Sequence, residues 1–109
     1  MATAYKVLGQ VEVSATTATT LYTVPGSTQT VVSTLVAVNK DAATCTIRIA
    51  VRPNGEALAD KHYLVYDATL AAKQTIAFTL GITIDASDVI TVYSSNAETS
   101  FNAFGSEIS

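Results

Sequence analysis

The sequence offers one imidazole as a candidate general base and one thiol as a candidate nucleophile. It has one histidine, His62, and one cysteine, Cys45. Acid–base catalysis needs several convergent polar groups with suitable proton affinity. His62 follows Lys61 at the start of an expected strand, which favours an exposed or interfacial imidazole over a catalytic base. Cys45 shares a strand face with Ile47 and Ile49, so we expect a buried, unreactive thiol.

The sequence also lacks the usual patterns of metal-binding and phosphate-binding sites. Asp85 and Asp88 flank an expected turn, and turn formation explains them better than metal binding, because a calcium loop needs more oxygen ligands at closer spacing. The segment GSTQT has neither the lysine nor the following helix of a phosphate-binding loop. We therefore predict a protein that is not an enzyme and has no catalytic residues, cofactor or metal.

The tyrosines suggest a different kind of site. Of the five in the chain, Tyr63, Tyr66 and Tyr93 lie on expected strands where their neighbours would leave them half exposed. We favour packing at the edge of the core with the hydroxyls in water, and a platform for a sugar is the alternative. With His62 they form the predicted ligand or partner face.

The elements that must position these residues have the period of β-strands throughout. Alternating apolar and polar residues predict about eight strands, separated by turn signals such as Pro25-Gly26 and Pro53-Asn54-Gly55. We predict a single all-β domain over residues 1–109, an antiparallel β-sandwich with a jelly-roll-like arrangement. The residues predicted for its core are Cys45, Ile47, Ile49, Ile76, Phe78, Leu80, Ile90 and Val92.

The stretch TQTVVSTLVAVNK, residues 28–40, is apolar on both faces of its expected strand. Such a strand is covered on both sides within its own domain, or on its second side by another chain. We predict the second arrangement, with one face in the core and the other against a neighbouring subunit. The predicted core face carries Val31, Ser33, Leu35 and Ala37. The predicted subunit face carries Val32, Thr34, Val36 and Val38.

Composition limits the partners of such a domain. Hydrophobic residues make up 49% of the chain and charged residues only 14%, so a disordered chain is excluded and the surface is poor in charge. The net charge of −3 and the scattered Lys and Arg residues disfavour nucleic acid as a partner. The start MATAYKVLG is unlike a signal peptide, and no run of about 20 apolar residues indicates a membrane partner. We expect a homo-oligomer, with a trimer favoured, because cyclic closure hides apolar faces and edges.

Four segments of the sequence resemble a known group of proteins. They are TTLYTVPGSTQTVVSTLVAVN, IRIAVRPNGEALADKHYLVYD, TLGITIDASDVITVYSS and SFNAFGSEI, and they extend from about Thr19 to Ile108. Together they are similar to small virion structural proteins of tailed bacteriophages. The sequence departs from that pattern where Pro25 directly precedes Gly26, since the pattern has a longer turn there.

The resemblance implies a small all-β protein that is made in the host cytoplasm and assembled on the virion, without active site or cofactor. It implies a capsid decoration (cement) protein that contacts the major capsid protein or other virion proteins, with a tail, neck or head-fibre component as an alternative. A receptor- or glycan-binding module is a further alternative. Tyr63, Tyr66 and Tyr93 favour that module, as does the use of jelly rolls in both lectins and capsids.

Overall fold

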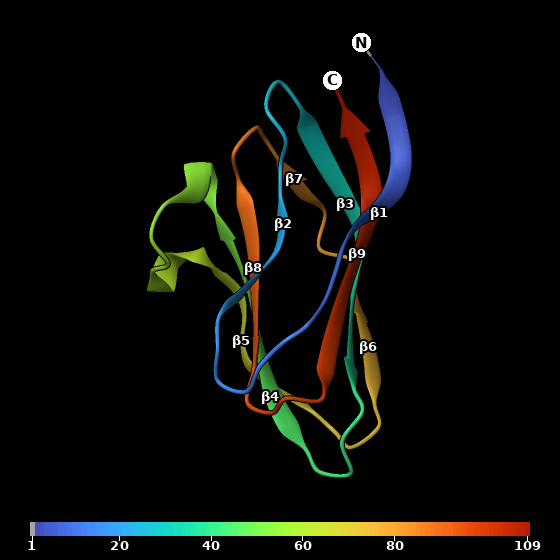
Figure 1. Cartoon of the computed structure of the whole chain (residues 1–109), viewed down its shortest axis with the longest axis vertical. Helices are drawn as coiled ribbons and strands as arrows, with labels where there is room; N and C mark the ends of the chain where they lie inside the picture. Colours follow the sequence, from blue (N-terminus) through green and yellow to red (C-terminus); the bar gives the residue numbers. More distant parts are fainter. Residues whose placement is uncertain (1) are drawn as a thin grey trace.

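The computed structural model describes residues 2–109, which form two antiparallel sheets packed face to face (Figure 1). The strands are β1 (Thr3–Glu12), β2 (Thr19–Thr23), β3 (Gln29–Asn39), β4 (Cys45–Arg52), β5 (Tyr63–Leu70), β6 (Thr75–Phe78), β7 (Ile82–Ile84), β8 (Val89–Ser94) and β9 (Thr99–Ile108). Two short 3-10 helices, η1 (Pro53–Gly55) and η2 (Asp60–His62), lie between β4 and β5. The predicted all-β sandwich is confirmed. Met1, which the predicted domain includes, lies outside the described residues.

Most successive strands lie in opposite sheets, as in a jelly roll. The first sheet has the order β1-β9-β3-β6, with β7 also paired to β3, and the second sheet has the order β2-β8-β4-β5. The connections β1–β2, β2–β3 and β3–β4 therefore each pass from one sheet to the other, as in the two Greek keys of a jelly roll. The strand beyond the predicted eight is β7, which is too short for its residues to show a period. Within residues 2–109, no helix has both the length and the apolar character needed to cross a membrane.

The hydrophobic core lies between the sheets. Five of the eight predicted core residues are buried, namely Cys45, Ile47, Ile49, Ile90 and Val92. Ile76 and Phe78 are only partly buried against the core, and Leu80 is 48% exposed. The predicted burial of Leu80 is wrong because β6 ends at Phe78, so Leu80 lies in the link to β7. The largest fully buried side chain is Phe101, which pairs with Ala37 in the first sheet.

A bulge in β3 exchanges the two faces of the strand along its length. The pairing of β3 with β9 shifts between Val32 and Thr34, so Ser33 is an extra residue. The bulge lies beside Gly105, where a Cβ atom would come within 2.0 Å of the Val31 carbonyl oxygen. Only glycine permits this approach. Because side chains alternate along a strand, one extra residue reverses the faces beyond it.

The faces predicted for residues 28–40 are therefore only partly correct. Val32 is 3% exposed and packs in the core, so its predicted place on the subunit face is wrong. Val31 was predicted in the core and instead lies on the surface. Leu35 and Ala37 are buried as predicted. On the outer side of β3 the strand presents Val31, Thr34, Val36 and Val38.

Candidate functional site

Three residues of the predicted ligand face, Tyr63, Tyr66 and Tyr93, meet on the outer side of the second sheet. The guanidinium of Arg48 lies between the rings of Tyr66 and Tyr93, 4.3 Å from each centroid. Tyr63 packs edge-on against Tyr66, with the ring centroids 4.8 Å apart and the planes at 76°. Cation–π and edge-to-face contacts of this kind are favourable. We call this arrangement of Tyr63, Tyr66, Arg48 and Tyr93 the tyrosine–arginine row.

A bulge in β5 gives the row its geometry. The pairing of β5 with β4 shifts between Ile47 and Ile49, and Asp67 takes a left-handed backbone conformation with φ of 52°. The Asp67 carboxylate accepts hydrogen bonds from Arg48 Nε at 2.6 Å and from Arg48 Nη2 at 3.2 Å. These bonds raise the pKa of Arg48 and lower the pKa of Asp67, so both groups are charged at neutral pH. The two hydrogen bonds to Asp67 fix the plane of the Arg48 guanidinium against the Tyr66 ring.

The sequence pointed to the tyrosines but not to Arg48. The missed signal is the alternation of β4, in which Arg48 lies between Ile47 and Ile49 and so faces away from the core. Arg48 pairs directly with Tyr93 across β4 and β8, and such opposite residues share a face.

A shallow hollow of about 410 Å³ lies at the Tyr63 end of the row. It is lined by Asp60, Tyr63 and Tyr66, and Tyr66 is 57% exposed. Two aromatic rings and one carboxylate therefore border the same space. The rings can stack on an apolar surface, and the carboxylate can accept hydrogen bonds from hydroxyl or amide groups.

His62, the fourth residue of the predicted face, is 5% exposed. The segment 53–62 folds back outside β4, as the green part of Figure 1 shows, and η2 turns the imidazole inward beneath it. His62 Nδ1 accepts a hydrogen bond from the Ala59 N–H at 3.0 Å, and Nε2 lies 3.3 Å from Glu56 Oε1. In the neutral ring Nε2 carries the proton and donates to Glu56. The expectation of an exposed imidazole is wrong, because the ring caps its own segment.

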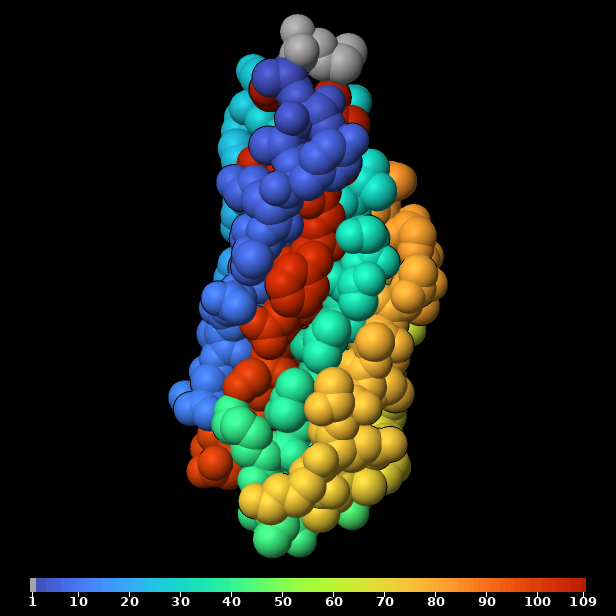
Figure 2. All heavy atoms as spheres, turned by 90° about the vertical axis from the view of Figure 1, so that its right-hand side faces the viewer, coloured from blue at the N-terminus to red at the C-terminus, as the bar shows by residue number. Residues whose placement is uncertain are grey.

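The outer side of the first sheet carries a second surface, formed by β1, β9 and β3, which lie side by side in Figure 2. Register places Val7 opposite Phe104, and Phe104 opposite Thr34. The most exposed member is Tyr5, at 85%, and Val7, Val31 and Phe104 are also exposed. We define the outer apolar face as Tyr5, Val7, Val31, Thr34, Val36, Val38 and Phe104.

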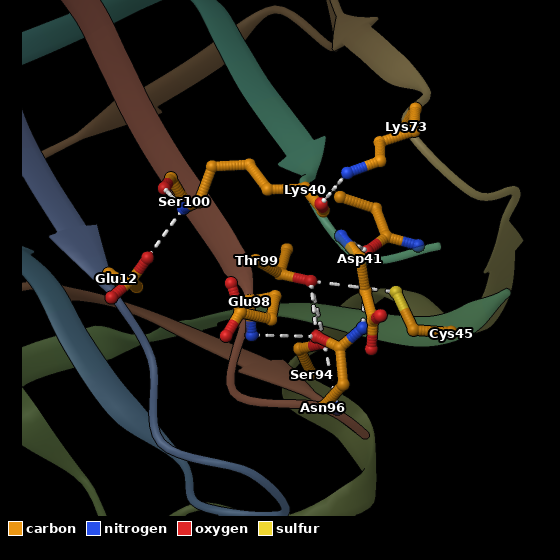
Figure 3. Close-up of polar contacts among 11 residues, drawn as sticks. Glu12, Lys40, Asp41, Cys45, Lys73, Ser94, Asn96, Glu98, Thr99 and Ser100 are labelled. Atoms are coloured by element: carbon orange, nitrogen blue, oxygen red, sulfur yellow. Dashed lines mark hydrogen bonds and ion pairs between the residues drawn. The ribbon is translucent and has the colours of Figure 1, made fainter. Parts of the chain in front are cut away.

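An ion pair closes one end of the outer apolar face. Glu12 Oε2 lies 2.5 Å from Lys40 Nζ, which also contacts the Ser100 hydroxyl of β9 (Figure 3). Among the described residues, Glu12 is the one charged residue that the register of the first sheet places on its outer side. The rest of that side is apolar or carries neutral polar groups.

Asn39 is a fully buried polar residue at the same end of the sandwich. Its Nδ2 donates to the carbonyl oxygens of Ala43, Leu70 and Ala71 at 2.9, 3.2 and 3.1 Å. Its Oδ1 accepts from Asn96 Nδ2 at 3.1 Å. One side chain thus joins the connections that follow β3, β5 and β8. Nothing in the sequence around Asn39 distinguishes it from an ordinary loop asparagine.

Cys45 belongs to a neighbouring buried polar cluster and not to a reactive site. It is buried as predicted, and its Sγ lies 3.5 Å from the Thr99 hydroxyl (Figure 3). Thr99 donates to Asn96 Oδ1 at 2.7 Å, and the Ser94 hydroxyl lies 3.0 Å from that of Thr99. No buried side-chain nitrogen or oxygen within residues 2–109 lacks a hydrogen-bond partner. The cluster therefore fastens β4, β8 and β9 together.

Asp85 and Asp88 form a turn, as the sequence predicts. Asp88 Oδ2 accepts from the Asp85 N–H at 2.8 Å, and Asp88 Oδ1 accepts from the Asn54 N–H at 2.8 Å. Asp88 therefore joins the β7–β8 turn to η1. In the described part of the chain, no group of three or more His, Cys, Asp or Glu residues is placed to hold a metal ion.

Glu107 links the two sheets near the chain termini. Its carboxylate accepts from the Tyr22 hydroxyl at 2.5 Å and pairs with Lys6 Nζ at 3.1 Å, while the Tyr22 hydroxyl also lies 2.8 Å from Thr30 Oγ1. Burial, reinforced by the bond to Glu107, raises the pKa of Tyr22 to about 12. The hydrogen bond from Tyr22, with help from Lys6, lowers the pKa of Glu107 below its ordinary value of 4.5.

Stability is therefore expected to fall in acid partly through Glu107. Since its pKa is lower in the folded chain, its contribution is fully present above pH 4.5 and is lost as the pH falls through the folded pKa. Urea unfolding of the wild-type protein and the Glu107→Gln variant between about pH 7 and pH 2 measures this loss. The two free energies should differ most near neutral pH and converge in acid. A difference that is independent of pH would contradict the role of the Glu107 charge.

Compared with known proteins, the chain matches no protein-family model and no curated protein sequence. The resemblance to phage virion proteins stays a prediction from the residues themselves.

Proposed function

We propose that this protein is a structural component of a tailed-bacteriophage virion, a capsid decoration protein that stabilises the assembled particle and performs no chemistry. The outer apolar face carries the proposal. It exposes Tyr5, Val7, Val31 and Phe104 on one side of a sheet where Glu12, paired with Lys40 at one end, is the one charged residue that the register places. Contiguous apolar surface of this kind marks a protein contact. Jelly rolls are common in capsids, which supports the role by analogy.

The occupant proposed for the outer apolar face is a second copy of the same chain. Half-buried Thr34, Val36 and Val38 continue the patch along β3, so an uncharged surface is offered to a similar one. A closed homo-oligomer, with three copies favoured, would cover the face without leaving it open to further addition. Contact through uncharged groups should weaken little as salt rises, in contrast to a charge-steered interface.

The oligomer would then bind the capsid. A subunit that binds only the assembled shell stabilises it by RT ln(1 + [L]/Kd) at each site, about 2.7 kcal/mol when the free protein is at 100 times its Kd. Summed over many sites, such contributions help a shell to resist heat and dilution. A tail, neck or head-fibre position would use the same surface, and electron microscopy of the intact particle would distinguish these places.

Light scattering of the purified protein at micromolar concentration tests the contact. We expect a homo-oligomer for the wild type and a monomer for Phe104→Glu, because that carboxylate would be buried unpaired in the interface. Thr69→Glu is the matched control, since Thr69 is exposed on the outer side of the second sheet. A monomeric wild type, or equal oligomers from both variants, would reject the outer apolar face as the contact.

A second experiment tests the virion role itself. Phage particles that lack the protein should lose their DNA at a lower temperature than complete particles, and adding the purified protein should restore them. If such particles are as robust as complete ones but fail to attach to host cells, the structural role is wrong. A receptor-binding role would then replace it.

A further inference from the structure

We infer that the hollow beside Tyr66 is a binding site for a neutral saccharide, a function separate from the assembly role proposed above. Asp60, Tyr63 and Tyr66 line its volume of about 410 Å³. A pyranose ring has an apolar C–H face and a rim of hydroxyl groups. The aromatic rings can stack on the C–H face, and the carboxylate of Asp60 can accept hydrogen bonds from the hydroxyl groups. Concave sites with a few placed polar groups are typical of small-ligand binding.

The rings that border the hollow are held in position before any ligand arrives. Tyr66 is 57% exposed, yet Arg48 stacks on it at 4.3 Å and is itself fixed by the two hydrogen bonds to Asp67. Tyr63 packs against Tyr66 from another direction, at 76°. An exposed aromatic side chain usually loses rotamer freedom when a ligand stacks on it, and prior ordering reduces that cost.

The charges around the hollow favour a neutral ligand over a charged one. An anion would be repelled by the Asp60 carboxylate. A basic side chain would be attracted to Asp60 and to the ring faces. However, the Arg48 guanidinium already lies over the Tyr66 ring, so a second cation would compete with it for the same π-system. A saccharide carries no charge for Asp60 to repel and can gain both stacking and hydrogen bonds.

Nuclear magnetic resonance titration of the full chain with four named sugars tests this inference. The probes are cellotriose, maltotriose, mannotriose and triacetylchitotriose, each raised to about 20 mM, since one stacked ring with few hydrogen bonds suggests a Kd of about 1 mM. At least one sugar should shift the amide signals of Asp60 and Tyr63–Asp67. Tyr66→Ala should weaken binding about tenfold. Tyr66→Phe, which keeps the ring, should bind nearly as well as the wild type.

Leu80→Ala is the matched control, because Leu80 is an exposed apolar side chain that belongs neither to the hollow nor to the outer apolar face. It should leave sugar binding unchanged. Asp60→Asn provides a second variant that leaves the tyrosine–arginine row intact, and it should weaken binding severalfold because a neutral acceptor is weaker than a carboxylate. Unchanged amide spectra elsewhere verify that each variant is folded.

Three results would overturn the inference. These are no shift with any of the four sugars, equal weakening by Leu80→Ala and Tyr66→Ala, or binding of trilysine in the hollow where the sugars fail. The last would make the hollow a site for basic side chains. Light scattering of Tyr66→Ala should still show the oligomer, so a failure of sugar binding is distinguishable from a failure of the assembly proposal.

Discussion

Replacing Asn39 with alanine is expected to destabilise the fold by about 3–5 kcal/mol, because several buried groups lose their partner and each costs roughly 1–3 kcal/mol. The two hydrogens of Asn39 Nδ2 are shared among the carbonyl oxygens of Ala43, Leu70 and Ala71, of which Ala71 also accepts from the Gln74 N–H. Urea unfolding followed by circular dichroism measures the loss. The effect should appear as a lower midpoint with an unchanged slope.

Two further variants separate the hydrogen bonds of Asn39 from its bulk. Asn39→Asp keeps the shape but replaces the donating amide with a carboxylate beside three carbonyl oxygens, so it should destabilise at least as much as alanine. Asn102→Ala is the control, because Asn102 lies on the outer side of β9 and should cost less than about 1 kcal/mol. Equal losses from Asn39→Ala and Asn102→Ala would show that Asn39 is not a structural hub.

The Phe101→Ala variant should lose about 3–5 kcal/mol, since a large side chain leaves a cavity between two sheets that cannot collapse onto it. Phe101 is fully buried in the middle of the first sheet and has neighbouring strands on both sides, β1 and β3. The same unfolding measurement applies, with native β-sheet content checked by an unchanged circular-dichroism spectrum.

Phe78→Ala is the matched comparison for Phe101→Ala. The alternating pattern of its segment predicts that Phe78 faces the core. In the structure Phe78 is only partly buried, at the end of the edge strand β6. Its loss should be smaller, about 1–2 kcal/mol, because water can fill part of the space. If Phe78→Ala costs as much as Phe101→Ala, the core is centred differently from the arrangement described above.

Much of the fold could be predicted from the sequence because strand alternation is a local property. Alternating segments with turn signals between them predicted an all-β sandwich, and the central residues Ile47, Ile49 and Val92 are buried as that pattern requires. Asp85 and Asp88 were also correctly assigned to a turn, since an aspartate bonds to backbone within a few residues of itself. These outcomes depend on neighbours along the chain.

The tertiary structure decided which face of a strand is buried once a bulge intervenes. Ser33 is ordinary in sequence, but the close approach of Val31 to Gly105, 74 positions later, admits it as an extra residue and moves Val32 into the core. The residue that selects the bulge is remote in sequence. A prediction that assumes unbroken alternation through Ser33 therefore assigns Val31 and Val32 to the wrong faces.

The candidate sites divide in the same way. Strand alternation was enough to place Tyr63, Tyr66 and Tyr93 on strands with room for partial exposure. Only the tertiary structure placed Arg48 between two of their rings, turned His62 under its own segment, and brought three connections to Asn39. Each of these depends on hydrogen bonds or stacking between different strands or on the path of a loop. Alternation specifies which side of a sheet a residue faces, whereas the partner it meets there depends on strand order and register.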